Sequence, residues 1–311
     1  MAPLFLLAVP MSDVSSSAEL SHRLDPAAAQ RVRQRLLAAQ PAPWLHEEIG
    51  RRMVERLAVI RQTPASVLLW PGDDGPLAPE LRAACPAATF QRVVEHRPPA
   101  GDGRPWWSRW RGEAPPRELA PEAALAGQTA LLWSVMRLHG EADPRALLAA
   151  WRRALAPDGF VMYATLGPGS LPQLRTLYAR QGWGPALALP VDMHDLGDMM
   201  VEAGFADPVM DQEQLHLTYS SPEALLEELR GLGANTAPGR FSGLRTPRWR
   251  AELLAGLHRL ADAQGRLHLT LEVVYGHAFR APDKGPAVSA DTRIALDDMK
   301  SMLRRRPPGG A

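Results

Sequence analysis

The chain has 311 residues, of which 46% are hydrophobic and 22% charged, and this composition excludes both a disordered protein and a small disulfide-stapled one. The 35 Lys and Arg against 34 Asp and Glu leave a net charge of +1, so we expect neither a nucleic acid nor a membrane as a partner. The single cysteine, Cys85, excludes an internal disulfide framework and a Cys-cluster metal site. A cytoplasmic protein fits this cysteine usage.

The apolar start of the chain, Met1–Val9, lacks a basic flank and is too short to cross a bilayer. A polar stretch typical of an ordinary N-terminus begins at Met11. Translation therefore begins at either Met1 or Met11, and we expect the first ten residues to be a loose arm or an artefact of the start assignment.

Helices and strands are predicted to alternate along most of the chain, which favours a mostly parallel sheet covered on both faces. Apolar residues at helical spacing, caps and proline starts predict helices over 24–40, 45–61, 77–84, 143–155, 192–204, 221–231 and 248–263. Short apolar or alternating runs predict strands over 67–70, 89–95, 129–136, 160–165, 209–219 and 267–274. The Arg- and Trp-containing stretch 97–121 is predicted to be a long loop.

Several short motifs occur in this sequence in the same order as in one known family. They are Trp44-Leu-His-Glu-Glu-Ile-Gly-Arg-Arg-Met53, Leu155-Ala-Pro-Asp-Gly-Phe160, Thr165-Leu-Gly-Pro-Gly-Ser-Leu-Pro-Gln-Leu-Arg175, Met193-His-Asp-Leu-Gly-Asp-Met-Met200, Ala203-Gly-Phe205, Leu232-Gly-Ala234 and Glu272-Val-Val-Tyr-Gly-His277. Together, over roughly residues 44–280, they resemble the malonyl-acyl-carrier-protein O-methyltransferase family of biotin synthesis.

That resemblance implies a class I methyltransferase fold, a Rossmann-like α/β architecture whose seven-stranded, mostly parallel sheet has helices on both faces. It also implies S-adenosyl-L-methionine as cofactor, and an acyl carrier protein or a small carboxylate as substrate. We expect an N-terminal arm and helix over 1–42, a methyltransferase-like domain over 43–280 and a largely disordered tail over 281–311, with a short helix possible over 293–303.

The cofactor loop departs from the family pattern. The resemblance implies a glycine-rich turn after the first strand, where glycines let backbone N–H groups approach the cofactor. Here the turn reads Leu69-Trp-Pro-Gly-Asp-Asp-Gly75, so Pro71 and Asp73 stand at two glycine positions and Gly75 is retained. A non-glycine residue in a left-handed conformation costs about 1–2 kcal/mol, which predicts weaker cofactor binding unless Gly72 substitutes in a shifted loop.

Five residues are candidates for cofactor binding. Asp73 could face the ammonium or the sulfonium group of the cofactor, and Glu95, at the end of the second strand, could accept hydrogen bonds from the ribose hydroxyls. Ser134, after the fourth family strand, could line the pocket, although packing is the alternative reading. The candidates are Gly72, Asp73, Gly75, Glu95 and Ser134.

Methylation of a carboxylate needs no general base, so no catalytic residue can be assigned from the sequence. A malonyl thioester needs a cation or hydroxyl to orient its carboxylate, and an acidic carrier needs a basic surface. Ser170 is a candidate because it follows the strand 160–165 at the ligand-binding edge of a parallel sheet. The charged candidates are Arg175, Arg240, Arg245 and Arg248, each of which could equally be a solvated surface residue.

Two further alternatives follow from the same residues. Asp192, His194, Asp195 and Asp198 resemble a metal cluster, but they lie at a predicted helix N-terminus, where carboxylates are favoured, so no metal is expected. The altered cofactor loop leaves open a pseudoenzyme, which would keep the methyltransferase scaffold and bind a partner protein without catalysis.

Overall fold

The computed structural model describes residues 24–38, 43–70, 79–94 and 117–281. Among them are seven strands, which form one sheet: β1 (Ser66–Leu69), β2 (Thr89–Val93), β3 (Arg117–Leu119), β4 (Thr129–Val135), β5 (Leu155–Leu166), β6 (Phe205–Tyr219) and β7 (Leu267–Arg280). Their order across the sheet is β3-β2-β1-β4-β5-β7-β6. All neighbours pair in parallel except β7, which runs antiparallel to both β5 and β6. The predicted seven-stranded, mostly parallel sheet is therefore confirmed.

Two of the helices begin at capping residues, Asp143 and Ser221, where the predicted helices over 143–155 and 221–231 also begin. Asp143 accepts a hydrogen bond from the Ala146 backbone N–H at 2.9 Å, and Ser221 accepts from that of Ala224 at 3.1 Å. The helices of the described residues are α2 (Pro26–Ala38), α3 (Trp44–Leu57), α4 (Pro79–Ala84), α5 (Pro121–Ala124), α6 (Pro144–Ala154), α7 (Pro172–Arg180), α8 (Met193–Glu202), α9 (Pro222–Leu232) and α10 (Pro247–His258), with a short 3₁₀ helix at Leu138–Gly140. None of them is long and apolar enough to cross a membrane.

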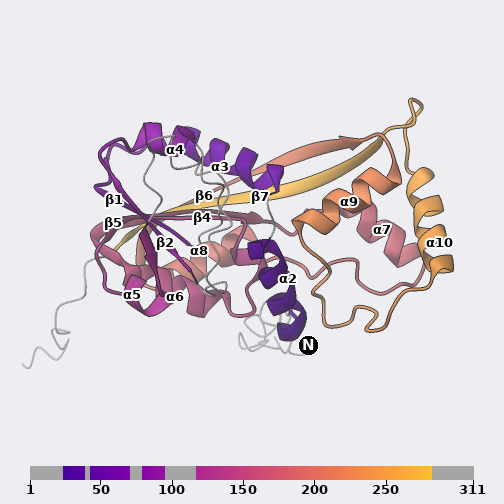
Figure 1. The fold of residues 1–311 in the computed structure, drawn as a ribbon, viewed down its shortest axis with the longest axis horizontal. Helices are drawn as coiled ribbons and strands as arrows, with labels where there is room; N and C mark the ends of the chain where they lie inside the picture. Colours follow the sequence, from indigo (N-terminus) through magenta and orange to yellow (C-terminus); the bar gives the residue numbers. More distant parts are fainter. Residues whose placement is uncertain (1–23, 39–42, 71–78, 95–116, 282–311) are drawn as a thin grey trace, which may run out of the picture. The chain divides into compact units, whose positions relative to one another are not determined.

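Two apolar cores lie on opposite faces of the sheet, with α3 and α4 on one side and α5, α6 and α8 on the other (Figure 1). On the first face, Ile49 and Met53 of α3 pack in the same core as Leu131 of β4. On the second face, Trp151 of α6 and Tyr163 of β5 are fully buried, with ring centroids 5.6 Å apart. Burying each large side chain contributes about 1.5–3 kcal/mol, so both layers stabilise the sheet.

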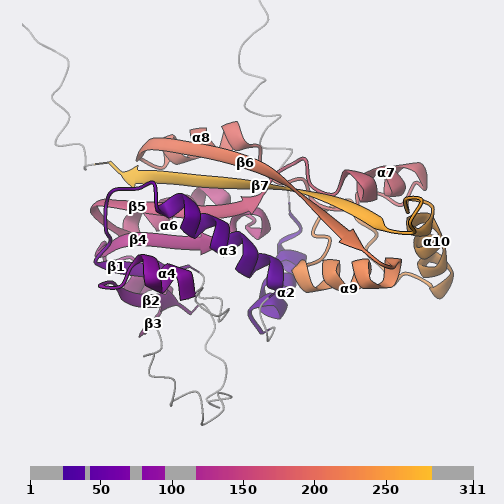
Figure 2. The ribbon, with the colours of Figure 1, turned by 90° about the horizontal axis from the view of Figure 1, so that it is seen from above.

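The hairpin of β6 and β7 extends beyond the rest of the sheet (Figure 2). Residues Val273–Phe279 of β7 pair with β5, whereas Leu267–Glu272 pair with β6 alone. This extension carries α7, α9 and α10 (Figure 1), and the buried side chains of Leu269 and Leu271 belong to the core that these helices share. A second group of helices thus stands next to the edge where the parallel strands end.

Several elements differ from the sequence predictions. Helix α7 and strand β3 were not predicted, and the 97–121 loop prediction was wrong at β3 and at Pro121, where α5 begins. Residues 156–159, between the predicted helix and the next predicted strand, form a bulge of β5, because β4 pairs first with Leu155 and next with Phe160. Gly159 is required there, since an added Cβ would lie 2.7 Å from the Thr129 carbonyl oxygen.

The described residues belong to one compact unit that ends at Ala281. The proposed division into 1–42, 43–280 and 281–311 stays a prediction. The helix suggested over 293–303 lies outside the described residues.

Candidate active site

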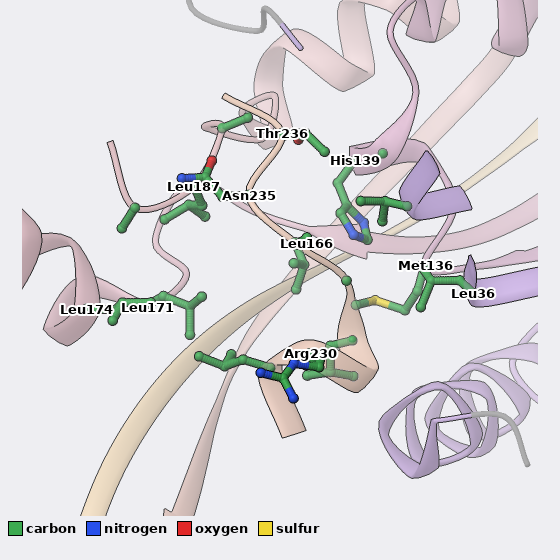
Figure 3. A pocket seen from close by; sticks show the side chains of 18 of the residues that line it. Leu36, Met136, His139, Leu166, Leu171, Leu174, Leu187, Arg230, Asn235 and Thr236 are labelled. Atoms are coloured by element: carbon green, nitrogen blue, oxygen red, sulfur yellow. The ribbon is translucent and has the colours of Figure 1, made fainter. Parts of the chain in front are cut away.

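A cavity of about 590 Å³ lies at the edge where β4 and β5 end (Figure 3). Val135 and Met136 line it from the end of β4, and Leu166 lines it from the end of β5. Leu171 and Leu174, from the start of α7, add apolar surface on the side shown next to Leu166 (Figure 3). In open parallel α/β sheets, ligands bind outside the carboxyl ends of the strands, so this is the expected place for a substrate.

The remaining walls come from segments that are distant in sequence. Helix α2 contributes Val32 and Leu36, and the chain between α7 and α8 contributes Leu187. The last turns of α9 and the chain after it contribute further side chains, and α10 closes the far side: Leu226, Leu229, Arg230, Leu232, Asn235, Thr236, Trp249, Arg250 and Leu253.

Helix α2 is tied to the chain that follows α9. The Asp25 backbone N–H donates to the Thr236 carbonyl at 2.8 Å, and Arg35 donates to the Gly233 carbonyl at 2.5 Å. Arg240 forms an ion pair with Asp25 at 2.8 Å. These contacts hold an N-terminal helix against the cavity that the sheet opens.

The charges that line the cavity have one sign. Of the described residues that line it, six are arginines, two are histidines and none is a carboxylate: Arg33, Arg35, Arg137, Arg230, Arg245, Arg250, His46 and His139. Glu141, just outside, accepts from Arg137 at 2.5 Å and lies 3.9 Å from Arg33. This excess of guanidinium groups favours an anionic ligand.

The guanidinium groups of two of these arginines form no ion pair or hydrogen bond with another described residue. Arg35 and Arg245 donate to backbone carbonyls, the latter to that of Trp183 at 2.9 Å. Neither Arg230 of α9 nor Arg250 of α10 forms such a bond within the ranges 24–38, 43–70, 79–94 and 117–281. Figure 3 shows the Arg230 guanidinium on the side of the cavity that faces Leu166 and Met136.

An aromatic cluster supports the wall formed by α10. The rings of Tyr178, Trp183 and Trp249 lie edge to face, with centroids 5.3–6.3 Å apart. The Arg245 guanidinium lies 4.6 Å from the Trp249 ring centroid. Burial raises the pKa of Tyr178, an effect that the nearby Arg245 charge partly offsets, so this phenol stays neutral at physiological pH.

The structure gives Ser170 a defined place at the base of this edge. Its hydroxyl donates to the Glu272 carbonyl and accepts from the Glu272 N–H, both at 3.1 Å, and it is fully buried. The Glu272 carboxylate accepts from the Gly169 N–H, and a Cβ at Gly167 would lie 2.1 Å from that carboxylate. The Gly-Pro-Gly-Ser run thus fastens the loop after β5 to β7, and the substrate-positioning role of Ser170 stays a prediction.

Of the predicted arginines, Arg245 lines the cavity. Arg175 donates to the Pro168 carbonyl at 2.8 Å and Arg240 pairs with Asp25, so both brace loops near the site. Arg248, 90% exposed, is paired with Glu252 at 3.1 Å. Their roles toward a substrate stay predictions.

Ser134 is buried in β4, and its hydroxyl has no hydrogen-bond partner among the described residues. His139 lines the cavity, with its Nδ1 atom 3.4 Å from the Thr165 hydroxyl. The other predicted cofactor residues, Gly72, Asp73, Gly75 and Glu95, lie outside the described residues.

The acidic residues around Asp192 lie at the start of a helix, as the sequence predicted. The Asp192 side chain accepts from the His194 backbone N–H at 2.8 Å and caps α8. Within the described ranges, His, Cys, Asp and Glu do not gather in threes in a way that could hold a metal ion.

The sheet order, the antiparallel β7 and the cavity at the carboxyl ends of the strands are those of the class I S-adenosylmethionine-dependent methyltransferases. No protein-family model matches the chain. The chain is 36% identical over 280 residues to the malonyl-[acyl-carrier protein] O-methyltransferase of Laribacter hongkongensis, covering 86% of this chain and 90% of that protein. Its identity to the enzyme of the same name from Halorhodospira halophila is 34%, with 84% and 90% covered. The chain belongs to the malonyl-[acyl-carrier protein] O-methyltransferase family.

Solved structures show more distant likenesses. The YcgJ protein of Bacillus subtilis has a TM-score of 0.46 and 10% identity, covering 75% of this chain and 99% of that one. The N-methyltransferase NodS of Bradyrhizobium japonicum, solved with S-adenosylhomocysteine, has a TM-score of 0.43 and 12% identity, with 82% and 100% covered. The family assignment depends on the sequence relatives and not on these structures.

Proposed function

We propose that this chain transfers the methyl group of S-adenosylmethionine to the free carboxylate of a malonyl thioester carried by an acyl carrier protein, a step of biotin synthesis. The observation that carries the proposal is the 36% identity to a curated enzyme of that name over 90% of its length. The described lining of the cavity contains arginines and no carboxylate, which supports an anionic methyl acceptor as its ligand. The cytoplasmic location inferred from the single cysteine stays a prediction.

Unpaired buried groups support the cofactor assignment. The Trp70 indole N–H and the Ser134 hydroxyl are both buried without a partner among the described residues. Trp70 directly follows β1, and its backbone N–H donates to Trp133 of β4 at 2.9 Å, so both groups lie near the ends of the two central strands. A buried polar group without a partner costs about 1–3 kcal/mol, which a bound polar ligand would recover. These groups fit a nucleoside cofactor, and Gly72, Asp73, Gly75 and Glu95 remain candidates to complete its site.

When bound, S-adenosylmethionine supplies an electrophilic methyl group. A malonyl carboxylate is already ionised at neutral pH, so the chain need not supply a base. The work left to its residues is to hold the carboxylate, align it and exclude water. The reaction therefore does not require either cavity histidine, His46 or His139, to accept a proton.

Arg230 is the residue best suited to hold the acceptor carboxylate. Its guanidinium lines the cavity, has no partner within the described residues, and faces the ends of the strands (Figure 3). A guanidinium can bind a carboxylate through two parallel hydrogen bonds, which fix its orientation as well as its position. Arg250 of α10 also lines the cavity, has the same chemistry and is the second candidate.

The apolar side chains suit the rest of the substrate. Leu36, Leu166 and Leu187 leave no charge to attract water close to the reacting group. Removing water from the site strengthens the attraction between Arg230 and a carboxylate. The combination of an apolar cavity with cationic walls is what a short acyl chain ending in a carboxylate requires.

Calorimetry and a transfer assay test the proposal. Purified chain is titrated with S-adenosylhomocysteine, then incubated with S-adenosylmethionine and malonyl-acyl carrier protein, and the carrier is followed by intact mass. We expect micromolar binding and a mass gain of one methylene per carrier. No heat and no product would favour the partner-binding pseudoenzyme instead.

The altered loop is tested separately by Gly75→Val. If this glycine cradles the cofactor, S-adenosylhomocysteine binding should fall roughly tenfold or more, because a β-branched residue in a left-handed conformation costs about 1–2 kcal/mol. The thermal melting temperature without ligand serves as the control for folding. Unchanged binding would remove Gly75 from the cofactor site.

A further inference from the structure

The chain around the start of α10 carries several basic side chains close together in sequence. Residues 231–251 contain four arginines and no aspartate or glutamate: Arg240, Arg245, Arg248 and Arg250. The chain as a whole carries a net charge of only +1, so this positive field is local.

The same segment exposes large apolar side chains. Leu244 is 96% exposed and Phe241 is 52% exposed. The Arg245 guanidinium lies 4.2 Å from the Phe241 ring centroid, which joins the apolar and cationic groups into one surface. Apolar residues gathered with charge in this way mark interaction sites more often than isolated exposed residues do.

This exposure belongs to a segment that is held in place. Asn235 donates to the Pro185 carbonyl at 2.7 Å, and Arg245 donates to the Trp183 carbonyl at 2.9 Å. The Thr246 side chain caps α10 by accepting from the Trp249 N–H. Leu244 is thus presented to solvent by anchored backbone on both sides.

The segment also forms part of the cavity wall. Arg245, Trp249 and Arg250 line the cavity, while Leu244 and Arg248 do not. A partner seated on the exposed residues would therefore have the cavity beside it. A reactive group on a flexible arm could enter without the body of the partner doing so.

We propose that Phe241, Leu244, Arg245, Arg248 and Arg250 form a carrier face, which docks the acidic surface of the protein that carries the thioester. This proposal rests on the proposed function and names where its macromolecular partner binds. Charge complementarity selects the occupant: the face carries three arginines against one neighbouring carboxylate, Glu252, and this excess of positive charge attracts an acidic protein and speeds its association. Leu244 and Phe241 supply the apolar contact at its centre.

The test compares two double variants with the same change in charge. Leu244→Glu/Arg248→Glu alters the carrier face without touching a cavity-lining residue. Val59→Glu/Arg61→Glu is the matched control, since both residues are exposed and precede β1 at the opposite edge of the sheet. Each protein is assayed with malonyl-acyl carrier protein and with malonyl-pantetheine, and its affinity for fluorescently labelled carrier is measured by anisotropy.

We expect the carrier-face variant to raise the Kd and the KM for the carrier roughly tenfold, with kcat/KM for malonyl-pantetheine and the control variant unchanged. Equal carrier binding by both variants, or equal loss with both substrates, would overturn the carrier face. Binding of anionic vesicles or RNA to this face in preference to the carrier would also overturn it. Failure of the proposed function is seen separately, as carrier binding without methyl transfer in the wild type.

Discussion

The arginines of α3 are paired with carboxylates, whereas around the cavity there are more arginines than carboxylates. Arg51 pairs with Glu48 and Glu55 at 2.8 and 2.5 Å. Arg52 reaches Glu48 at 2.8 Å and Glu213 at 3.3 Å. This network joins the helix to β6.

Arg56 completes the α3 network. It pairs with Asp211 at 2.8 Å and lies 3.7 Å from the centroid of the Tyr275 ring. Around the cavity, by contrast, Glu141 forms ion pairs with Arg137 and Arg33. The guanidinium groups of Arg230 and Arg250 have no carboxylate partner in the described residues. Whether an arginine is paired with a carboxylate, rather than its residue type, therefore separates an arginine that stabilises the fold from one that is available to a ligand.

The largest expected effect comes from removing an unpaired cavity arginine. Arg230→Ala should lower kcat/KM for malonyl thioesters roughly 10- to 100-fold, because a hydrogen bond to a charged group contributes about 1.5–3 kcal/mol. Since this guanidinium makes no bond within the described fold, the free energy of unfolding should stay unchanged. Steady-state kinetics and urea unfolding measure the two quantities.

Arg230→Lys and Arg61→Ala are the controls for that variant. Lysine keeps the charge but not the paired donors, so it should recover part of the KM effect. Arg61 is exposed at the far edge and its loss should change nothing. A fall in stability without a fall in activity would place Arg230 with the structural arginines.

The opposite result is expected from the α3 network. Glu213 accepts from the Tyr275 hydroxyl at 2.5 Å and lies next to Arg52 and Arg56. Glu213→Ala should lower the free energy of unfolding by about 1–2 kcal/mol, because it leaves the partly buried Tyr275 hydroxyl without its acceptor and removes one of the two carboxylates next to each of Arg52 and Arg56. Cofactor binding should be unaffected.

Glu213→Gln tests the same contact more narrowly. The amide oxygen keeps an acceptor for Tyr275, so the loss in urea unfolding should be smaller than for alanine. If either variant lost catalytic efficiency as well as stability, the arginines of the α3 network and those of the cavity could not be assigned separate roles.

The sequence predicted the parts of the fold whose local signals are strong. Asp143 and Ser221, each followed by proline, gave the starts of α6 and α9, and the alternation in 267–274 gave part of β7. Helix α7 was missed because its N-cap, Leu171, is held in a left-handed conformation with φ 54° inside a Gly-Pro run. Strand β3 has only three residues, too few for any periodic pattern.

The site was less predictable because it is assembled from distant segments. Arg245 was among the candidates, but Arg230 and Arg250 look like any other surface arginine in the sequence. Position decides their importance, and no local pattern encodes it. For Arg250 the available signal was the lack of acidic residues over 231–251, but Arg230 lies outside that stretch and follows Glu227 and Glu228.

Lowering the pH sharpens the comparison, since the α3 network contains Glu48, a carboxylate with a shifted pKa. Hydrogen bonds from Arg51 hold the pKa of Glu48 below its ordinary value of 4.5, opposed by partial burial and helped by Arg52. A lowered pKa in the folded state means that this contribution is present above the unfolded value and is lost as pH falls through the folded value. Stability should therefore decline below about pH 4.5, and Glu48→Gln should make that decline shallower in urea unfolding across pH.

The smallest effect on stability should come from Arg248→Ala, which removes an arginine that is paired with a carboxylate but exposed to solvent. Its ion pair with Glu252 joins a side chain that is 90% exposed to one that is 48% exposed, so water and salt already screen it. Thermal and urea unfolding should change by no more than about 0.5 kcal/mol, as for other exposed i,i+4 pairs. Carrier affinity should nevertheless fall, because the lost charge belongs to the carrier face. A large loss of stability would instead assign Arg248 the structural role of the α3 arginines. Pairing with a carboxylate would then mark an arginine as structural even where its side chain is exposed.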